Sequence, residues 1–319
     1  MTDTETDVPD PTLQSAIEEA SAVVDAVIEN VKTVIVGHHD EIEHIMTALL
    51  GRGHILLEDV PGVGKTMLAR SVAESFDGSF KRVQFTPDLL PSDVTGVNVY
   101  NEKSQEFEFR PGPVFANVVL GDEINRAPPK TQSALLEAME EQQVTVDGET
   151  YDVPEPFTVI ATQNTVEGDR AYDLPMAEVD RFLKKLRLGY PEESEETELL
   201  GRVVGSHPID ELESVASLGD LQHARDVAAS VTVADHVREY ATQLANYTRE
   251  HAQLGVSPRG TISLLRAAQG RALLDGRDYV IPDDIQTEGP SVLTHRIRTT
   301  TDRTASDVVR EAFDEVPVR

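Results

Sequence analysis

Hydrophobic and polar residues follow two different periods along this chain, and the change of period divides the chain in two. Apolar side chains recur every three or four positions over residues 13–31, which predicts an amphipathic helix, and a second helix is predicted over 40–50, ending at Gly51. Short apolar runs with the length of buried strands follow at residues 54–58, 81–85, 118–122, 157–162 and 184–188. Because helical or loop segments separate these runs, we expect a five-stranded parallel α/β sheet with helices on both faces.

Two segments between the predicted strands alternate as hairpins do. They cover residues 97–110 and 144–153, and the second turns at Asp147-Gly148, a dipeptide typical of tight hairpin turns. We interpret both as exposed hairpins. Exposed loops on a rigid scaffold are common places for partner contacts.

After Tyr190 and Pro191 only helical periodicity remains. Helices are predicted at residues 192–204, 218–230, 234–251, 259–274 and from 282 onward. The first 11 residues are polar and include two prolines, which predicts a flexible acidic leader. The sequence therefore predicts a leader over residues 1–11, an α/β domain over 12–191 and a smaller all-α domain over 192–319.

Charge is the unusual feature of the composition. The chain carries 57 acidic and 28 basic residues, a formal net charge of −29, and only 7 of the basic residues are lysines. Many hydrated carboxylates and few lysines are typical of proteins that stay dissolved in concentrated salt, where screening weakens self-repulsion. The alternative is an acidic protein of ordinary surroundings. No basic patch is visible in the sequence, which disfavours nucleic-acid binding.

The chain has no cysteine, which excludes disulfides and thiolate metal sites. No apolar run has the roughly 18 residues that a membrane span needs, and the acidic start is unlike a signal peptide. We therefore expect no membrane insertion and a cytoplasmic location. The nine histidines do not fall at metal-ligand spacings, so we expect no histidine metal site.

Candidate chemistry begins in residues 59–66, DVPGVGKT, between a predicted strand and a predicted helix. They match the phosphate-binding pattern G-x-x-x-x-G-K-[ST], except that Asp59 replaces the first glycine. Gly62 and Gly64 let backbone N–H groups face phosphate oxygens, Lys65 reaches the β- and γ-phosphates, and the Thr66 hydroxyl can bind Mg²⁺. The predicted binding residues for ATP and Mg²⁺ in this loop are Pro61, Gly62, Val63, Gly64, Lys65, Thr66 and Met67.

Two adjacent carboxylates, Asp122 and Glu123, follow the predicted strand VVLG. In a phosphate-binding fold of this kind the first is placed to hold Mg²⁺ through water, and the second to take a proton from the attacking water. Adjacent carboxylates are often ordinary solvent-exposed residues without a catalytic role, but the apolar strand before this pair favours the functional interpretation. The pair predicts hydrolysis of ATP.

A further strand, FTVIAT, leads to Asn164. An amide at that position can hold the water that attacks the γ-phosphate without competing for its proton. Taken alone, Asn164 reads as a turn residue at a strand end. Its order after the loop and the carboxylate pair favours the catalytic role.

These segments together resemble the MoxR family of AAA+ ATPases. The resemblance rests on LLEDVPGVGKT, GDEINRAPPKTQSALLEAMEEQQVT, FTVIATQNT, LPMAEVDRF and SPRGTISLLRAAQGRALLDGRDYVIPDDI, spread from about Val34 to Arg298. It implies a P-loop NTPase core with an all-α lid, and a ring of six identical subunits with ATP bound between neighbours. The sequence departs from the family at Asp59 and at Thr165, where proline is common.

The resemblance also implies roles outside the loop. Arg181 matches the arginine presented to the next subunit's γ-phosphate, although pairing with Asp180 on the surface is the alternative. Arg259 matches the sensor that links nucleotide state to lid position. Val36 and Gly37 match the segment that packs on adenine. Arg126 is a further candidate for contact across an interface, and the two hairpins match inserts that project toward the pore or face of the ring.

The sequence thus predicts a Mg²⁺-dependent ATPase that remodels or matures protein complexes in a chaperone-like way. The resemblance connects it with von Willebrand factor A domain proteins as partners. The alternatives are a nucleic-acid translocase, a magnesium-chelatase-like subunit and a nucleotide-gated scaffold that does not hydrolyse ATP.

Overall fold

A sheet of five parallel strands forms the centre of the α/β domain in the computed structural model, which describes residues 11–59, 62–164, 172–203, 208–300 and 302–318. The strand order is β2-β5-β8-β1-β9. These strands are β1 (Ile55–Asp59), β2 (Phe80–Gln84), β5 (Val118–Asp122), β8 (Thr158–Asn164) and β9 (Lys184–Leu186). The predicted parallel sheet is confirmed. Because all strands run the same way, their carboxyl ends share one edge, where α/β proteins bind ligands.

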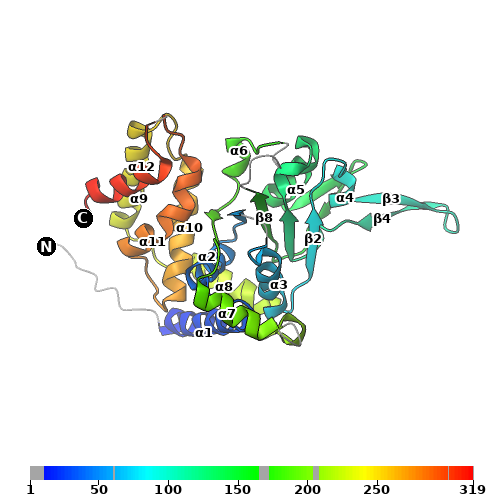
Figure 1. Ribbon diagram of the computed structural model, residues 1–319, viewed down its shortest axis with the longest axis horizontal. Coiled ribbons are helices and arrows are strands. Elements are labelled where there is room, and N and C mark those ends of the chain that lie inside the picture. Colours follow the sequence, from blue (N-terminus) through cyan, green and yellow to red (C-terminus); the bar gives the residue numbers. More distant parts are fainter. Residues whose placement is uncertain (1–10, 60–61, 165–171, 204–207, 301, 319) are drawn as a thin grey trace.

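Helices cover both faces of the sheet (Figure 1). One face carries α1 (Pro11–Val34), α2 (His39–Leu50) and α3 (Lys65–Ser75), and the other carries α5 (Pro129–Glu141). Ile55 and Leu57 of β1 are buried in the core of the first face, whereas Leu56 packs in the second core with Leu135. Successive strand residues point to opposite faces, so a strand covered on both sides needs a continuous apolar run. This is the run seen in the sequence.

Both predicted hairpins are confirmed. Their strands are β3 (Gly96–Asn101) with β4 (Glu106–Pro111), and β6 (Gln143–Val146) with β7 (Glu149–Asp152); the short α4 (Pro91–Thr95) precedes β3. Phe109 stacks on Tyr151 with ring centroids 3.9 Å apart, which ties the two hairpins together. The β3–β4 hairpin extends away from the body (Figure 1), and Tyr100 and Phe107 are exposed on it.

The helical region confirms the predicted helices and divides the last one. The lid consists of α9 (Asp235–His251), α10 (Pro258–Leu274), α11 (Pro282–Leu293) and α12 (Ala305–Glu315). One helical segment was expected from Pro282 onward, but a short 3-10 turn, η3 (Thr294–Arg296), follows α11. Beyond it Arg298 pairs through its backbone with Leu254, which holds the chain in an extended conformation before α12. No helix in the described part of the chain has both the length and the apolar composition to span a membrane.

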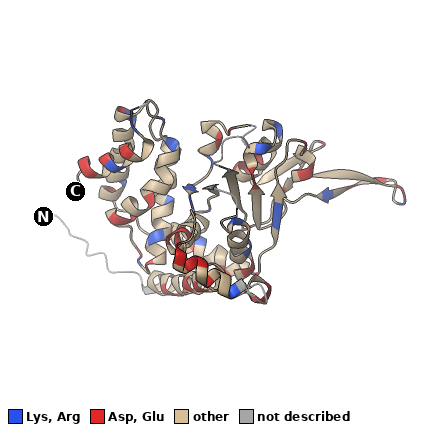
Figure 2. Ribbon diagram, in the orientation of Figure 1, with Lys and Arg blue, Asp and Glu red and all other residues tan. Residues whose placement is uncertain are grey.

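Two helices lie between the sheet domain and the lid along the chain. They are α7 (Glu193–Val203) and α8 (Leu218–Ser230). In space α8 packs against α1 and α2 as well as α10, and α7 lies beside α1 (Figure 1). Acidic side chains crowd α7 (Figure 2). The boundary at residues 191 and 192 stays a prediction.

A buried cluster of charges joins the lid to the sheet. Lys184 of β9 forms an ion pair with Glu288 of α11, and both side chains are 0% exposed. Glu288 also accepts from Arg271 Nε of α10 at 3.0 Å, and Arg271 continues to Glu43 of α2 at 2.6 Å. One carboxylate therefore bridges a cation of the α/β domain and a cation of the lid.

Burial and ion pairing shift the pKa values of Glu288 and Lys184 in opposite directions. Burial works to raise the pKa of Glu288, but Lys184, His44 and Arg271 hold it at about 2. Burial lowers the pKa of Lys184 to about 8, although Glu288 works in the other direction. Both groups therefore stay charged at neutral pH, and each depends on the other to offset its desolvation.

Candidate nucleotide-binding site

The predicted phosphate loop joins β1 to α3. Gly62 and Gly64 both have φ of 88°, a left-handed conformation that favours glycine, and open space surrounds the point where a Cβ would stand on each. The helix begins at Lys65, and its N-cap Gly64 makes no side-chain cap hydrogen bond. The N–H groups of a first helical turn are suited to binding phosphate. Pro61 and the side chain of Asp59 lie outside the described residues.

A cavity of about 250 Å³ lies between this loop and the carboxylate pair. Its lining consists of Gly62, Gly64, Lys65, Thr66, Met67, Arg82, Gln84, Asp122 and Glu123. The structure thus brings the loop and the carboxylate pair, about 55 residues apart in sequence, to one space at the carboxyl edge of the sheet. Val63 instead packs against the core.

Thr162 at the end of β8 fixes both carboxylate residues. Its hydroxyl donates to Asp122 Oδ1 at 2.7 Å and accepts from the backbone N–H of Glu123 at 2.8 Å. Glu123 has φ of 56°, a conformation that non-glycine residues rarely adopt. Such backbone strain clusters at functional sites. Here it turns the chain sharply after the strand, directly at the cavity.

Both carboxylates already have basic or amide partners. Arg82 of β2 donates to Asp122 Oδ2, with Nη2 at 2.5 Å, and Arg126 Nη1 donates to Glu123 Oε2 at 2.7 Å. Gln84 donates to the same Glu123 oxygen at 2.8 Å. Sequence reasoning missed Arg82 and Gln84, because only the pairing of β2 with β5 brings their side chains to the carboxylates.

Asn164 is the last residue of β8, and its backbone pairs with Asp59 of β1 in the parallel register. It therefore ends at the same edge as the phosphate loop. The side chain of Asn164 and all of Thr165 lie outside the described residues. The role of Asn164 stays a prediction.

The predicted adenine segment lies beside α7. Val36 is buried, and Gly37 has φ of 71°. The carboxylate of Glu195 stands where a Cβ on Gly37 would lie, within 2.8 Å. Neither residue lines the cavity at the loop, and adenine packing stays a prediction.

Arg181 and Arg259 meet at one carboxylate outside that cavity. Arg181 Nε lies 3.2 Å from Glu140 Oε2 near the end of α5, and Arg259 pairs with Glu140 Oε1. Arg181 also donates to the carbonyl of Leu136 at 2.9 Å. Its ion-pair partner is thus Glu140 rather than Asp180, which pairs with Arg296. Neither Arg181 nor Arg259 is among the residues that line the cavity at the loop.

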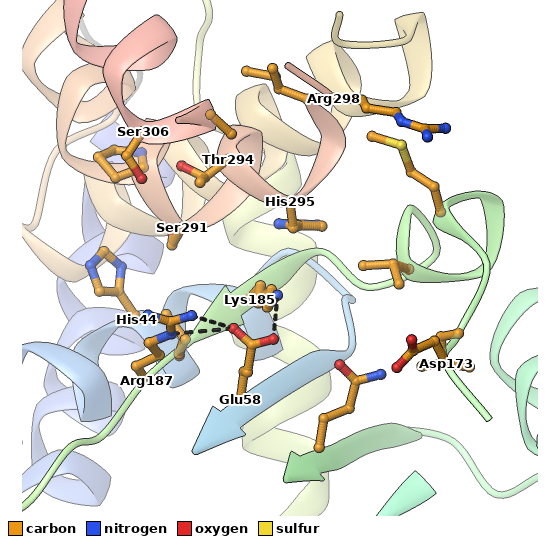
Figure 3. Close-up of a pocket in the computed structure, with 18 of the residues that line it drawn as sticks. His44, Glu58, Asp173, Lys185, Arg187, Ser291, Thr294, His295, Arg298 and Ser306 are labelled. Carbon is orange, nitrogen blue, oxygen red and sulfur yellow. Dashed lines mark hydrogen bonds and ion pairs between the residues drawn. The ribbon is translucent and has the colours of Figure 1, made fainter. Parts of the chain in front are cut away.

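A larger cavity of about 750 Å³ lies between the carboxyl ends of the strands and the lid (Figure 3). Lys185 and Arg187 bind the carboxylate of Glu58 there, with shortest distances of 3.0 and 2.6 Å. Burial works to raise the pKa of Glu58, but these hydrogen bonds hold it below its ordinary value. Because the two cations already share a carboxylate, this space suits a triphosphate less well than the cavity at the loop does.

The fold and this site define a AAA ATPase with its lid. The model of the ATPase family associated with various cellular activities (AAA) matches residues 54–184, and the model of the AAA lid domain matches residues 244–315. The chain is 54% identical over 282 residues to the uncharacterized protein YeaC of Bacillus subtilis, covering 88% of each chain. It is 42% identical to Chaperone MoxR1 of Mycobacterium tuberculosis, covering 89% of this chain and 78% of that one.

A crystal structure of a protein from Cytophaga hutchinsonii has the same fold. It superposes with a TM-score of 0.90 at 36% sequence identity, and the match covers 97% of this chain and 100% of that chain. The chain belongs to the MoxR family of AAA ATPases.

Proposed function

We propose that this chain hydrolyses ATP with Mg²⁺ and uses the turnover, as a homo-oligomeric ring, to remodel protein clients. The observation that carries the proposal is the cavity in which the phosphate loop faces Asp122 and Glu123. Phosphoryl transfer needs N–H donors and cations for the phosphates, and carboxylates for the metal and the attacking water. This cavity offers both kinds of group at one edge of the sheet.

Glu123 is the proposed general base. Gln84 and Arg126 both donate to its Oε2, so we assign proton uptake from the attacking water to Oε1. The backbone N–H of Glu123 donates to the Thr162 hydroxyl, which fixes the position of the backbone that carries this carboxylate. Asn164 is proposed to hold the water in line from the neighbouring strand end.

Thr66 and Asp122 fit a magnesium ion by the chemistry of their donors. Hydroxyl and carboxylate oxygens are the ligands that Mg²⁺ prefers. Asp122 Oδ2 accepts from both Nε and Nη2 of Arg82, whereas Oδ1 accepts from the Thr162 hydroxyl and has a second acceptor position for a metal-bound water. The ion, when bound, neutralises phosphate charge.

The arginines support a site shared between subunits. Arg181 and Arg259 are 30% and 51% exposed, pair with Glu140 and are not among the described residues that line the cavity at the loop. We propose that both reach the γ-phosphate held by a neighbouring subunit, in a ring whose six-fold number is taken from the family. A cation supplied across an interface in this way is worth roughly 10³–10⁵ in turnover. Val36 and Gly37 are proposed to pack on the adenine of ATP.

The proposed clients are proteins. One relative is named a chaperone. The β3–β4 hairpin, which extends away from the body (Figure 1), carries the exposed aromatic residues Tyr100 and Phe107. We propose von Willebrand factor A domain proteins as the partner class. Such a partner should raise the rate of ATP turnover when added to the ring.

The test is ATP hydrolysis in molar KCl with Mg²⁺ over a range of protein concentrations. Glu123→Gln should lower turnover by at least about 100-fold, because the amide cannot accept the proton. Arg181→Ala should lower turnover by about 1000-fold, and wild-type specific activity should rise with protein concentration as subunits associate.

Two controls accompany these variants. Glu141→Gln makes the same change of charge on the exposed end of α5, and Arg238→Ala removes an exposed lid arginine. Both should keep wild-type turnover. Specific activity that does not depend on concentration, together with an active Arg181→Ala, would exclude the shared site.

A further inference from the structure

Glu140 holds two arginines that come from different domains. It lies in the last turn of α5, and its two carboxylate oxygens bind different partners, Arg181 through Oε2 and Arg259 through Oε1. Arg181 follows the short helix α6 (Met176–Val179) in the α/β domain, and Arg259 lies in the first turn of α10 in the lid. A single side chain therefore connects the two residues proposed to serve a neighbour's nucleotide.

Arg296 binds the residues on both sides of Arg181, namely Asp180 and Phe182. The Arg296 side chain, 2% exposed, donates to Asp180 Oδ1 at 2.7 Å and to the backbone carbonyls of Asp180 and Phe182 at 3.0 and 2.6 Å. Ser257, the N-cap of α10, donates to Asp180 Oδ2 at 3.4 Å. The backbone beside Arg181 and the start of α10 are thus held to each other.

Glycine makes this approach possible. A Cβ on Gly260 would lie 2.7 Å from Arg296 Cδ and 2.7 Å from Val256 Cγ1. Gly260, next to Arg259, therefore packs closely against Arg296, the arginine that binds Asp180. The lid and the α/β domain meet closely at this point, which brings the two guanidinium groups within reach of one carboxylate.

Two guanidinium groups at one place repel each other, and a carboxylate between them offsets the repulsion. A planar guanidinium also gains orientation from a carboxylate partner. We propose that Glu140 is a positioning residue that gathers Arg181 and Arg259 into one dicationic unit, ready for the phosphates of a neighbouring subunit. The inference rests on the proposed function, since it concerns the same shared site.

The unit has a consequence for the energetics of turnover. Glu140 is not among the described residues that line the cavity at the loop, so we expect its loss to leave ATP binding to its own subunit intact. A misplacement of about 1 Å in a catalytic group can cost roughly 100-fold in rate. Loss of Glu140 therefore lowers turnover without weakening nucleotide affinity.

The experiment compares Glu140→Gln with Glu137→Gln, an exposed glutamate one turn earlier on the same helix. Glu140→Gln should lower kcat by about 10- to 100-fold, whereas Glu137→Gln should keep the wild-type value. Binding of a fluorescent ATP analogue should be equal in both. Equal kcat for Glu140→Gln, Glu137→Gln and wild type would overturn the inference. A higher kcat for Glu140→Gln would also overturn it, because Glu140 would then inhibit turnover.

Coupling between the residues separates positioning from a general loss of structure. In an Arg181→Ala background, adding Glu140→Gln should change kcat by less than about twofold, because the unit is already broken. If Glu140→Gln lowers kcat in the Arg181→Ala background by as large a factor as in wild type, the inference is overturned.

Mixed rings give a readout that fold damage would not produce. Glu140→Gln subunits have an intact cavity, and Glu123→Gln subunits have intact arginines, so mixing the two impaired proteins should give activity above that of either alone. No restoration, with Arg181→Ala and Glu123→Gln mixtures active, would overturn the role of Glu140 while leaving the proposed function in place. If Arg181→Ala by itself has wild-type turnover, the shared site of the proposed function fails instead.

Discussion

Glu288 and Glu140 each form ion pairs with two cations, Glu288 in the core and Glu140 at the surface. Each carboxylate bridges one cation of the α/β domain and one of the lid: Glu288 binds Lys184 and Arg271, and Glu140 binds Arg181 and Arg259. Glu288 is 0% exposed, whereas Glu140 is 32% exposed. The geometry of a bridge is thus repeated in the core and at the surface.

The difference in burial decides what each bridge can be used for. A buried ion pair that loses one partner leaves a charge without solvent, which is strongly destabilising. A pair with solvent access loses little when it opens, because water replaces the partner. The Glu288 bridge therefore fixes the lid on the sheet, and the Glu140 bridge keeps its two arginines at the surface, where a neighbouring subunit can reach them.

The largest expected effect is on the buried bridge. Glu288→Gln should lower the free energy of unfolding by about 3–5 kcal/mol, because Lys184 and Arg271 lose the charge that offsets their burial. Denaturant unfolding in molar KCl measures it. The control is Glu43→Gln, which removes the 35% exposed partner of Arg271 and should cost less than about 1 kcal/mol. Equal losses in the two variants would contradict the comparison.

A pH series sharpens the same contrast. The pKa of Glu288 is about 2 in the folded protein, below its ordinary value of 4.5, so the unfolded chain binds more protons between these values. The stability from this group is present above pH 4.5 and is lost as pH falls toward 2. The difference in unfolding free energy between wild type and Glu288→Gln should therefore shrink over that window, whereas a constant difference would argue against the low pKa.

The smallest expected effect on stability belongs to the exposed bridge. Glu140→Gln should change the free energy of unfolding by less than about 1 kcal/mol, although its turnover falls. Thermal unfolding beside an ATPase assay measures both quantities on one preparation. A loss of stability as large as that of Glu288→Gln would show that the two bridges do not differ in kind.

Much of the fold followed from local sequence patterns. The strand at 118–122 and the helix at 218–230 were predicted with the bounds that the structure gives, because a buried strand and an amphipathic helix have distinct periods. The single segment expected from Pro282 onward was divided, since side-chain and backbone contacts of Arg296 and Arg298 with distant parts of the chain interrupt the helix.

The site was predictable to the extent that its residues are local in sequence. The loop with Gly62, Gly64 and Lys65 and the pair Asp122 and Glu123 follow strands, and a parallel sheet brings strand ends to one edge. The structure puts both groups on one cavity. Arg82 and Gln84 carry no such signal, because nothing in their own segment shows which strand lies beside it.

The sequence by itself determined the periods of its helices and strands, the phosphate loop, the carboxylate pair and the excess of acidic charge, since each is a property of neighbouring residues. Only the tertiary structure decided which charges share a partner. Glu140 lies 41 residues before Arg181 and 119 residues before Arg259, and Glu288 lies 104 residues after Lys184. Side chains so distant along the chain meet only in the folded structure, and the packing of the lid against the sheet sets which carboxylate is buried and which one remains in contact with water.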